Sequence, residues 1–243
     1  VATGDPDPRT AGRGLAILRA GGLAVDCGTL AREARSAMAG FLTRQALGRA
    51  FVTLKLASSL DGCIALADGT SRWITGPEAR AHAHLERARH EAILVGRGTW
   101  EADAPSLDVR LPGMAARSPL RIILSSRPDL SDASRVRSSP AGGGKGEDAP
   151  IRITSPQAIA TLPADHLLIE GGAATAAAFL HANLVDRLLL YRAPILIGGG
   201  LPALHDIGLT DLSDAHGRWR RVDARRLGSD TLEVYSAAPC SPA

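Results

Sequence analysis

Cysteine, aromatic residues, lysine and long apolar runs are all scarce in this 243-residue chain. The three cysteines, Cys27, Cys63 and Cys240, are isolated and odd in number, which supports neither a disulfide framework nor a structural zinc site. No apolar stretch reaches the roughly 18 residues that a membrane-spanning helix needs, and the first residues lack the charged-then-apolar order of a signal peptide. We therefore expect a cytoplasmic protein with no membrane partner and no metal site.

An excess of one charge is also lacking. The 28 lysine and arginine residues and the 25 acidic residues give a net charge of +3, which is too balanced to indicate a nucleic-acid partner. Only Lys55 and Lys145 are lysines, and Lys145 lies in a glycine-rich segment. Lys55 lies in the apolar run 51–57, which is typical of a strand. A half-buried lysine there can bind an anion or act as an acid; an edge-strand lysine that opposes aggregation is the alternative.

The length and the 45% hydrophobic content allow one large domain plus an appendage. Residues 1–50 contain two expected helices, at 11–20 and 30–45, and no strands that could form a sheet. From residue 51 onward, strand-like and helix-like runs alternate. Strands are expected near residues 51–57, 91–96, 120–124, 151–154, 167–170, 187–193 and 231–237, and helices near 77–89, 98–103, 155–161 and 173–182.

This alternation predicts an α/β fold, in which a mixed sheet with parallel central strands carries helices on both faces. After Leu188 no further helix is expected, which favours antiparallel strands that close one edge of the sheet. The polar residues 125–150, rich in glycine and proline, are expected to form a surface loop. The predicted domains are therefore 1–50 and 51–243.

The clearest candidate site follows the apolar run 167–169, where Glu170, Gly171 and Gly172 precede an alanine-rich helix. Unpaired N–H groups at a helix start and the helix dipole favour an anionic phosphate, and glycines let a ligand approach the backbone. A carboxylate beside an anion site is better suited to accept hydrogen bonds from ligand hydroxyl or amino groups. The alternative is an ordinary strand-to-helix turn with a solvated glutamate.

A second glycine turn, Gly96-x-Gly98-Thr99, follows the apolar run 92–95. It lacks the third glycine of a dinucleotide-binding fingerprint, so it is weak evidence by itself. The strand expected at 120–124 ends in Ser125, Ser126 and Arg127, whose hydroxyl groups and guanidinium suit a ribose 2′-phosphate. Any nicotinamide cofactor is therefore expected to be NADPH.

Half of a zinc deaminase motif is present, because His84-Leu85-Glu86 matches its His-x-Glu part. The second half, Pro-Cys-x-x-Cys, is missing, since only Ser, Pro and Ala follow Cys240. His82 and His84 lie on different faces of an arginine-rich helix and are expected to be solvated.

Six motifs in order show that residues from about 51 to 238 resemble the reductase domain of the bacterial bifunctional riboflavin biosynthesis pyrimidine deaminase/reductase. They are KLASSLDG at 55–62, SRWITG at 71–76, AILVGRGT at 92–99, ADAPSLDVR at 102–110, EGGA at 170–173 and APILIGG at 193–199. The resemblance implies a dihydrofolate-reductase-like fold and a homodimer. It also implies that NADPH reduces 5-amino-6-(5-phosphoribosylamino)uracil to the ribitylamino compound.

The first fifty residues resemble the tail of the deaminase domain of that family, with DPDPRTAGRG at 5–14 and LRAGG at 18–22. The zinc-binding part that precedes this tail in the family is absent from the chain. We expect the full-length protein to carry an N-terminal zinc deaminase domain, and we expect no deaminase activity from these residues.

The resemblance and the glycine turns together assign the site residues. Residues expected to bind the cofactor are Ala57, Trp73, Gly96, Thr99, Asp103, Ser125, Gly171, Gly172, Ala173, Ala174, Thr175, Ala176, Ala177 and Ala178. Residues expected to bind the phosphorylated pyrimidine are Ser71, Arg87, Leu107, Arg110 and Glu170, and the two arginines suit its 5′-phosphate.

The expected catalytic residues are Lys55, Asp103 and Glu170. The closed ribosylamine must open to an imine before C1′ can accept a hydride, and opening needs a proton at the ring oxygen, for which Lys55 is favoured over Asp103. The chain has Ala104 where the family commonly has a second aspartate, which affects the charge of this loop. The alternatives are a pterin reductase, a related reductase with another substrate, and a non-catalytic nucleotide-binding dimerisation module.

Overall fold

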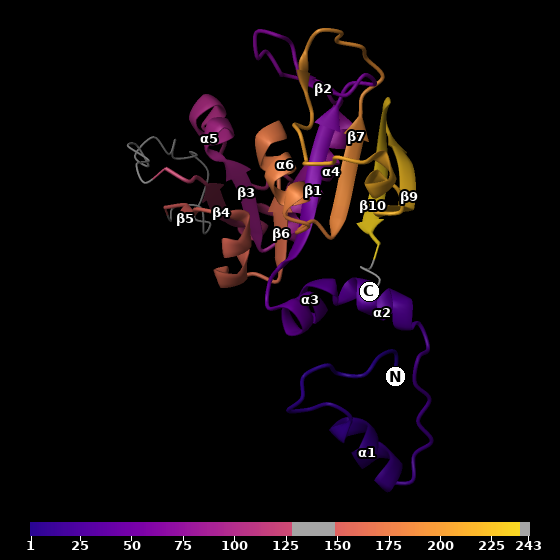
Figure 1. The fold of residues 1–243 in the computed structure, drawn as a ribbon. Helices are drawn as coiled ribbons and strands as arrows, with labels where there is room; N and C mark the ends of the chain where they lie inside the picture. The colour runs from indigo at the N-terminus through magenta and orange to yellow at the C-terminus, as the bar shows by residue number, and fades with distance from the viewer. Residues whose placement is uncertain (128–148, 239–243) are drawn as a thin grey trace. The chain divides into compact units, whose positions relative to one another are not determined.

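The computed structural model describes residues 1–127 and 149–238. It divides into two compact units, one made of Val1–Phe51 with Ile159–Asp165 and the other of Val52–Ala158 with His166–Ala243 (Figure 1). Most of the surface loop expected at 125–150, together with Lys145 and Cys240, lies outside the described residues.

The first unit is helical. It contains α1 (Arg13–Ala20), α2 (Ala31–Ala37) and α3 (Ala39–Leu47). The single helix expected at 30–45 is wrong, because Met38, with φ −106° and ψ 19°, leaves the helical conformation and separates α2 from α3. Arg44 on α3 holds the unit together, since its Nε donates to Asp165 at 2.8 Å.

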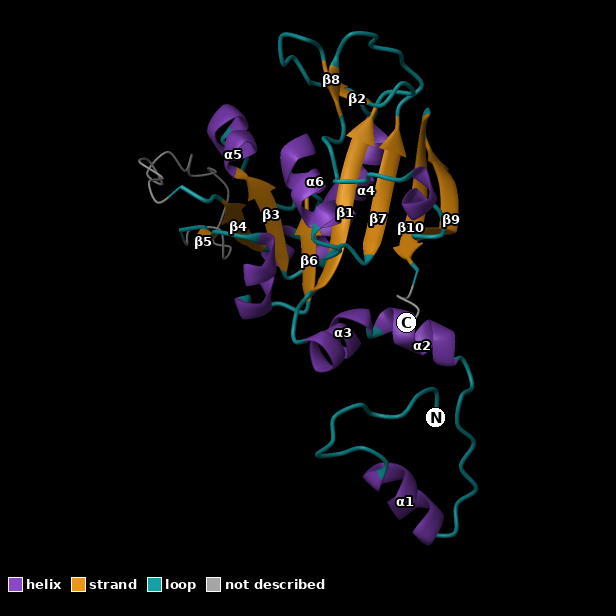
Figure 2. Ribbon diagram, in the orientation of Figure 1, coloured by secondary structure: helices purple, strands orange, loops and turns teal. Residues whose placement is uncertain are grey.

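The second unit contains an eight-stranded sheet in the order β5-β4-β3-β6-β1-β7-β10-β9 (Figure 2). Parallel pairs join β3 to β4 and β6, β4 to β5, and β1 to β7, whereas β10 runs antiparallel to β7 and β9. A separate two-stranded ribbon pairs β2 with β8. The strands are β1 (Phe51–Ser58), β2 (Cys63–Ala65), β3 (Ala92–Gly96), β4 (Leu120–Leu124), β5 (Ile151–Ile153), β6 (His166–Ile169), β7 (Arg187–Arg192), β8 (Leu201–Pro202), β9 (Trp219–Leu227) and β10 (Asp230–Ala237).

Helices cover both faces of this sheet, with α4 and α6 on opposite sides (Figure 2). The helices of the second unit are α4 (Pro77–Arg89), α5 (Arg97–Asp103) and α6 (Ala173–His181), with 3-10 turns η1 (Ala115–Arg117) and η5 (Leu212–Ala215). A further 3-10 turn, η4 (Pro156–Thr161), spans the boundary between the units at Ala158. The predicted mixed α/β sheet with antiparallel C-terminal strands is confirmed. None of the helices within the described ranges has the length and apolar character needed to span a bilayer.

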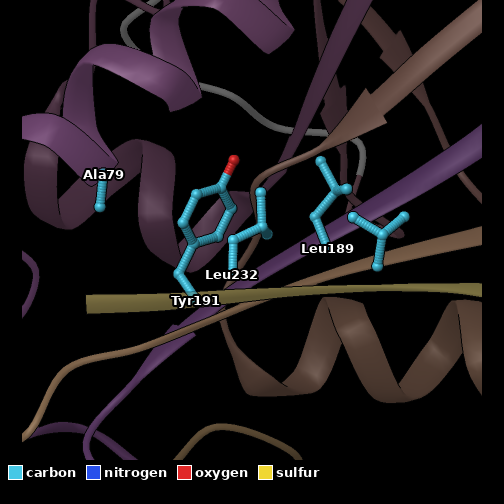
Figure 3. Close-up of a cluster of buried hydrophobic side chains, with 5 residues drawn as sticks. Ala79, Leu189, Tyr191 and Leu232 are labelled. Atoms are coloured by element: carbon cyan, nitrogen blue, oxygen red, sulfur yellow. The ribbon is translucent and has the colours of Figure 1, made fainter. Parts of the chain in front are cut away.

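The core beneath α4 fixes the sheet at the place where Lys55 lies. Ala79 of α4 packs on a cluster from β7 and β10, in which Tyr191 and Leu232 are the central residues (Figure 3). Each fully buried large apolar side chain contributes about 1.5–3 kcal/mol to folding. Lys55 pairs in register with Leu189, so its side chain rises from the same face of the sheet, toward α4.

Candidate active site

The ends of β3, β4 and β6 surround a pocket of about 710 Å³, which we call the glycine pocket. β4 and β6 each pair in parallel with β3. The carboxyl ends of the three strands, and the loops that follow them, therefore lie at one edge of the sheet. Lining residues from these three connections are Gly96, Arg97, Gly98, Thr99, Ser125, Ser126, Arg127, Gly172, Ala173, Ala174 and Thr175. Two glycine turns far apart in sequence thus contribute to one concave surface.

The glycines of these turns fall into two kinds. A Cβ atom on Gly96 would lie 2.1 Å from Thr175 Oγ1, and one on Gly171 would lie 2.6 Å from Thr175 Cβ. These two glycines let the first turn of α6 pack closely against β3. In contrast, a Cβ on Gly98 would meet no atom of the described structure within 4 Å, and one on Gly172 would meet only Thr99 Oγ1, at 3.5 Å. Gly98 and Gly172 therefore leave backbone open to a ligand.

The start of α6 supplies hydrogen-bond donors to this pocket. Gly172 is the N-cap, and no side chain among the described residues caps the helix. The first N–H groups of a helix have no partner within it, and the helix dipole makes this end partly positive. Because Ala173, Ala174 and Thr175 line the pocket, these donors are available to an anionic ligand.

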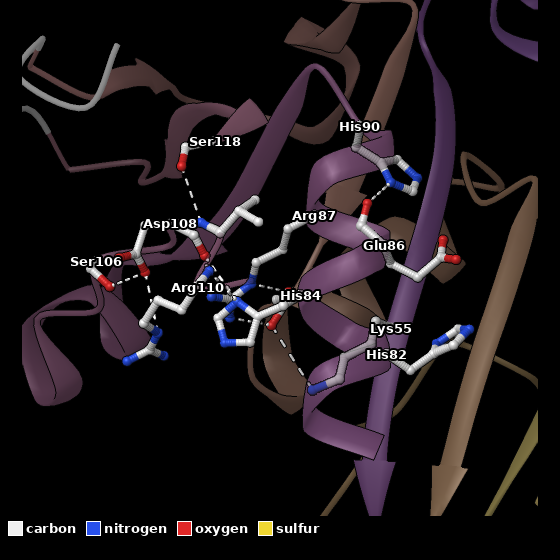
Figure 4. Close-up of polar contacts among 12 residues, drawn as sticks. Lys55, His82, His84, Glu86, Arg87, His90, Ser106, Asp108, Arg110 and Ser118 are labelled. Carbon is white, nitrogen blue, oxygen red and sulfur yellow. Dashed lines mark hydrogen bonds and ion pairs between the residues drawn. The ribbon is translucent and has the colours of Figure 1, made fainter. Parts of the chain in front are cut away.

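Glu170, two residues before the N-cap of α6, belongs to a second region, which we call the charged cluster and which consists of Lys55, His84, Arg87, Asp108, Arg110 and Glu170. Figure 4 labels the first five of these residues. Arg87 of α4 donates two hydrogen bonds to the Glu170 carboxylate, from Nε to Oε1 at 2.7 Å and from Nη2 to Oε2 at 2.9 Å. Lys55 Nζ is farther away, at 3.9 Å from Glu170 Oε2. Arg87 is therefore the structural partner of Glu170, and the ammonium of Lys55 keeps donors for a ligand.

Burial and charge shift the titration of this cluster. Burial lowers the pKa of Lys55 and Arg87 lowers it further, against the opposing charge of Glu170. Burial alone would raise the pKa of Glu170, but the charge and hydrogen bonds of Arg87, aided by Lys55, hold it below its ordinary value. The cluster thus keeps a fixed carboxylate beside an ammonium that gives up its proton more readily than a solvated lysine.

The expectation that His82 and His84 are solvated is wrong. His82 Nδ1 lies 2.8 Å from the hydroxyl of the buried Tyr191, whose ring lies 5.8 Å from Lys55 Nζ. His84 Nδ1 lies 3.2 Å from the backbone of both Asp108 and Arg110. Burial lowers the pKa of both histidines. Sequence reasoning missed these contacts because the partners come from β7 and from the loop after α5.

Several residues assigned from the sequence are neither among the lining residues of the glycine pocket nor members of the charged cluster. Trp73 is 66% exposed, and the guanidinium of Arg80 lies 4.6 Å from the centre of its ring. Ser71 and Asp103 are exposed, Asp103 at the last position of α5. Ala57 packs against the core cluster beneath α4. Their cofactor and substrate roles stay predictions.

Other assigned residues are buried. Leu107 is 3% exposed and packs with Ile93, Val95 and Leu168. Ala176 and Ala177 are buried on the inner face of α6 and, like Ala178, are not among the residues that line the glycine pocket.

The pocket also includes residues that the sequence reasoning did not single out. Arg97 and Glu101, joined by a 2.6 Å ion pair along α5, both line it, as does His205. The ribbon of β2 and β8 closes one side through Ile64 and Leu201. Residues four apart on a helix are neighbours, so the pairing of Arg97 with Glu101 could have been predicted from the sequence. The strands β2 and β8 are too short to show the alternation of apolar and polar residues that predicts a strand.

Comparison with known proteins adds the following findings. The family model described as the RibD C-terminal domain matches residues 50–232. The riboflavin biosynthesis protein RibD of Mycobacterium tuberculosis strain H37Rv is 38% identical over 236 residues, covering 95% of this chain and 67% of the relative. A solved Thermotoga maritima diaminohydroxyphosphoribosylaminopyrimidine deaminase/5-amino-6-(5-phosphoribosylamino)uracil reductase matches with TM-score 0.81 and 28% identity, covering 98% of this chain and 70% of the neighbour. An Enterococcus faecalis dihydrofolate reductase complexed with NADP(H), at TM-score 0.52 and 16% identity, covers 77% of this chain and 96% of its own and shows a shared fold alone.

Proposed function

Because this chain belongs to the RibD C-terminal domain family, we propose that its site reduces 5-amino-6-(5-phosphoribosylamino)uracil to 5-amino-6-(5-phosphoribitylamino)uracil with NADPH, in riboflavin biosynthesis. The observation that carries the proposal is the junction of β6 and α6. There Glu170 enters the charged cluster while the next residues open the glycine pocket. One junction thus supports a site for a polar substrate and a site for a dinucleotide side by side.

The glycine pocket fits a nicotinamide dinucleotide. Gly98 and Gly172 leave backbone accessible, and the uncapped start of α6 favours phosphate. Arg97 in the lining is paired with Glu101, whereas Arg127 lies beside Ser125 and Ser126. This guanidinium and the two hydroxyl groups suit the additional 2′-phosphate of NADPH rather than the free hydroxyl of NADH.

The charged cluster would hold the substrate. The side chain of Arg110 is 61% exposed, and its Nε lies 3.5 Å from Asp108 Oδ1, so the guanidinium keeps donors that can bind the 5′-phosphate. Arg87 is engaged with Glu170 and with the backbone oxygen of Asp108, at 3.0 Å, so its role is to orient them. Glu170 would accept hydrogen bonds from ribose hydroxyls or pyrimidine N–H groups.

Lys55 is the proton donor in this proposal. Bound NADPH supplies a hydride to C1′ of the sugar. The Lys55 ammonium would donate a proton to the ring oxygen; as the C1′–O bond breaks, the nitrogen lone pair forms a C1′=N bond, which gives a protonated imine and a free sugar hydroxyl, and leaves Lys55 as a neutral amine. Burial lowers the pKa of Lys55, which favours the transfer, and the Glu170 carboxylate keeps the ammonium charged until the substrate is bound.

The proposal extends to the partners of the chain. The Thermotoga neighbour is both a deaminase and a reductase by name, and this chain spans 70% of that neighbour. We expect a zinc deaminase domain in the full-length protein and a homodimer formed through the reductase domain. Sedimentation of the purified chain at several concentrations tests the dimer.

The test of function is an assay of NADPH oxidation, followed by its absorbance, with the deaminated phosphoribosylamino pyrimidine as substrate. The proposal expects turnover with NADPH that exceeds turnover with NADH, and the ribitylamino product by mass spectrometry. Dihydrofolate serves as the control substrate. Turnover of dihydrofolate alone, or binding of NADPH without oxidation, would overturn the proposal.

A further inference from the structure

The segment 107–110, which we call the arginine turn, lies within the connection between α5 and η1 and carries Arg110. Its first residue, Leu107, has a φ of 55°, a conformation that bulky side chains rarely adopt. The side chain of Leu107 is 3% exposed among core residues, so it anchors one end of the turn. Such a backbone persists only where the surroundings hold it.

Side chains from two other elements fasten the rest of the turn. His84 Nδ1 lies 3.2 Å from the amide nitrogen of Arg110 and 3.2 Å from the carbonyl oxygen of Asp108 (Figure 4). Arg87 donates to the same carbonyl at 3.0 Å, and Ser118 Oγ accepts from the Val109 N–H at 3.1 Å. Every residue from 108 to 110 thus has a backbone group bonded to a side chain.

The imidazole of His84 can tie the turn in either neutral tautomer. With the proton on Nε2, Nδ1 accepts from the Arg110 N–H; with the proton on Nδ1, it donates to the Asp108 carbonyl. The side chain of Arg110 is 61% exposed, and its acidic partner among the described residues, Asp108 with Oδ1 3.5 Å from Arg110 Nε, belongs to the same turn. The direction in which this cation points is therefore set by the backbone that His84 holds.

We infer that His84 is a positioning residue, which fastens the arginine turn to α4 so that Arg110 meets the phosphate of the substrate. The inference rests on the proposed function and extends it by one residue. It concerns the affinity for the phosphorylated pyrimidine and not the chemistry at C1′, because His84 contacts the turn and not the ammonium of Lys55.

The test separates KM from kcat. His84→Leu removes the ring nitrogen and is expected to raise the KM for the phosphorylated pyrimidine about three- to ten-fold, the effect of losing one hydrogen bond, while kcat and the KM for NADPH change less than about twofold. His84→Asn places an amide oxygen and nitrogen near the position of Nδ1 and is expected to restore most of the affinity. His181→Leu is the matched control, because His181 Nδ1 also bonds a loop carbonyl, that of Ile207, at 3.1 Å.

A second variant removes the hydrogen bond between Ser118 and the arginine turn. Ser118→Ala removes the acceptor of the Val109 N–H and is expected to raise the same KM about two- to five-fold, without a change in kcat. Equal KM values in the wild-type protein, His84→Leu and Ser118→Ala would overturn the inference and leave the proposed function standing. Should His84→Leu fail to fold, Ser118→Ala decides, and an unchanged KM for the phosphorylated pyrimidine in that variant overturns the inference. A wild-type protein without reductase activity would overturn both proposals.

Discussion

The glycine pocket and the charged cluster share one junction, between β6 and α6, but they are built in different ways. In the pocket, backbone amides and small residues supply the polar groups, and close packing of Thr175 on Gly96 and Gly171 fixes their position. In the cluster, long side chains from β1, α4 and the end of β6 hold one another by charge. The pocket therefore depends on steric fit, and the cluster depends on electrostatic balance.

This difference decides how each region responds to substitution. A buried ion pair that loses one partner leaves an uncompensated charge, which is costly, whereas a surface pair loses little. A glycine under close contact tolerates no added methyl group, whereas a glycine facing open space accepts one. Four variants test the contrast.

Lys55→Met should have the largest effect. Methionine fills a similar volume but has no proton to donate, so turnover should fall by about 10²–10⁴-fold while NADPH still binds with nearly wild-type affinity. Steady-state kinetics and a fluorescence titration with NADPH measure the two quantities. Normal turnover would remove Lys55 from the mechanism, and loss of NADPH binding would show that the two regions are not separable.

Glu170→Gln should show the electrostatic balance of the cluster in its stability. The change leaves Arg87 and Lys55 without their carboxylate, and we expect a loss of about 3–5 kcal/mol in the free energy of unfolding. The pKa of Glu170 lies below its ordinary value of 4.5, so its stabilising effect is full above that pH and declines as the pH falls below it.

The difference in stability between wild type and Glu170→Gln should therefore shrink with acidification below pH 4.5. Urea unfolding at several pH values measures it. Glu101→Gln is the control, because Glu101 is half exposed and its ion-pair partner among the described residues is Arg97 on the same helix, so its removal should cost no more than about 1 kcal/mol. A difference that does not depend on pH would contradict the charge-based account of Glu170.

Gly96→Ala should show the steric nature of the pocket. The added methyl group would meet Thr175 Oγ1 at 2.1 Å, and we expect a loss of about 1–3 kcal/mol in stability. Thr175→Ala in the same chain removes that oxygen and should recover part of the loss, so a double-mutant cycle should give a favourable coupling energy. Additive effects of the two substitutions would show that the contact does not limit the pocket.

How much the sequence predicts also differs between the regions. The glycine turns are local patterns, and Gly96, Gly98, Gly172 and Ser125 do line one pocket as such patterns indicate. The cluster joins residues that are far apart in the chain, such as Arg87 and Glu170. The sequence indicated Arg87 and Glu170 separately, each as a candidate ligand-binding residue. That the two residues pair with each other depends on the tertiary structure and could not be predicted.

The fold shows the same division. Apolar runs predicted the buried strands, and the helix expected near 77–89 coincides with α4. The strand β9 escaped detection because Trp219–Leu227 is rich in arginine and lies at an exposed edge of the sheet, so it has no apolar alternation to reveal it. The break between α2 and α3 at Met38 was missed because Met38 and its neighbours Ala37 and Ala39 all favour a helix, and Gly40 lies inside α3 and not at the break.

Gly98→Ala should cause the smallest change in stability among the four variants. The change should be a gain, whereas Gly96→Ala should cause a loss. Gly98 lies inside α5, where alanine is favoured, and its added methyl group would meet no described atom within 4 Å, so stability should rise by about 0.5–1 kcal/mol. If NADPH approaches the backbone here, the same methyl group obstructs it, and the KM for NADPH should rise while the KM for the pyrimidine stays constant. A more stable protein with unchanged NADPH affinity would place the dinucleotide away from Gly98, and would confine its contacts to the start of α6.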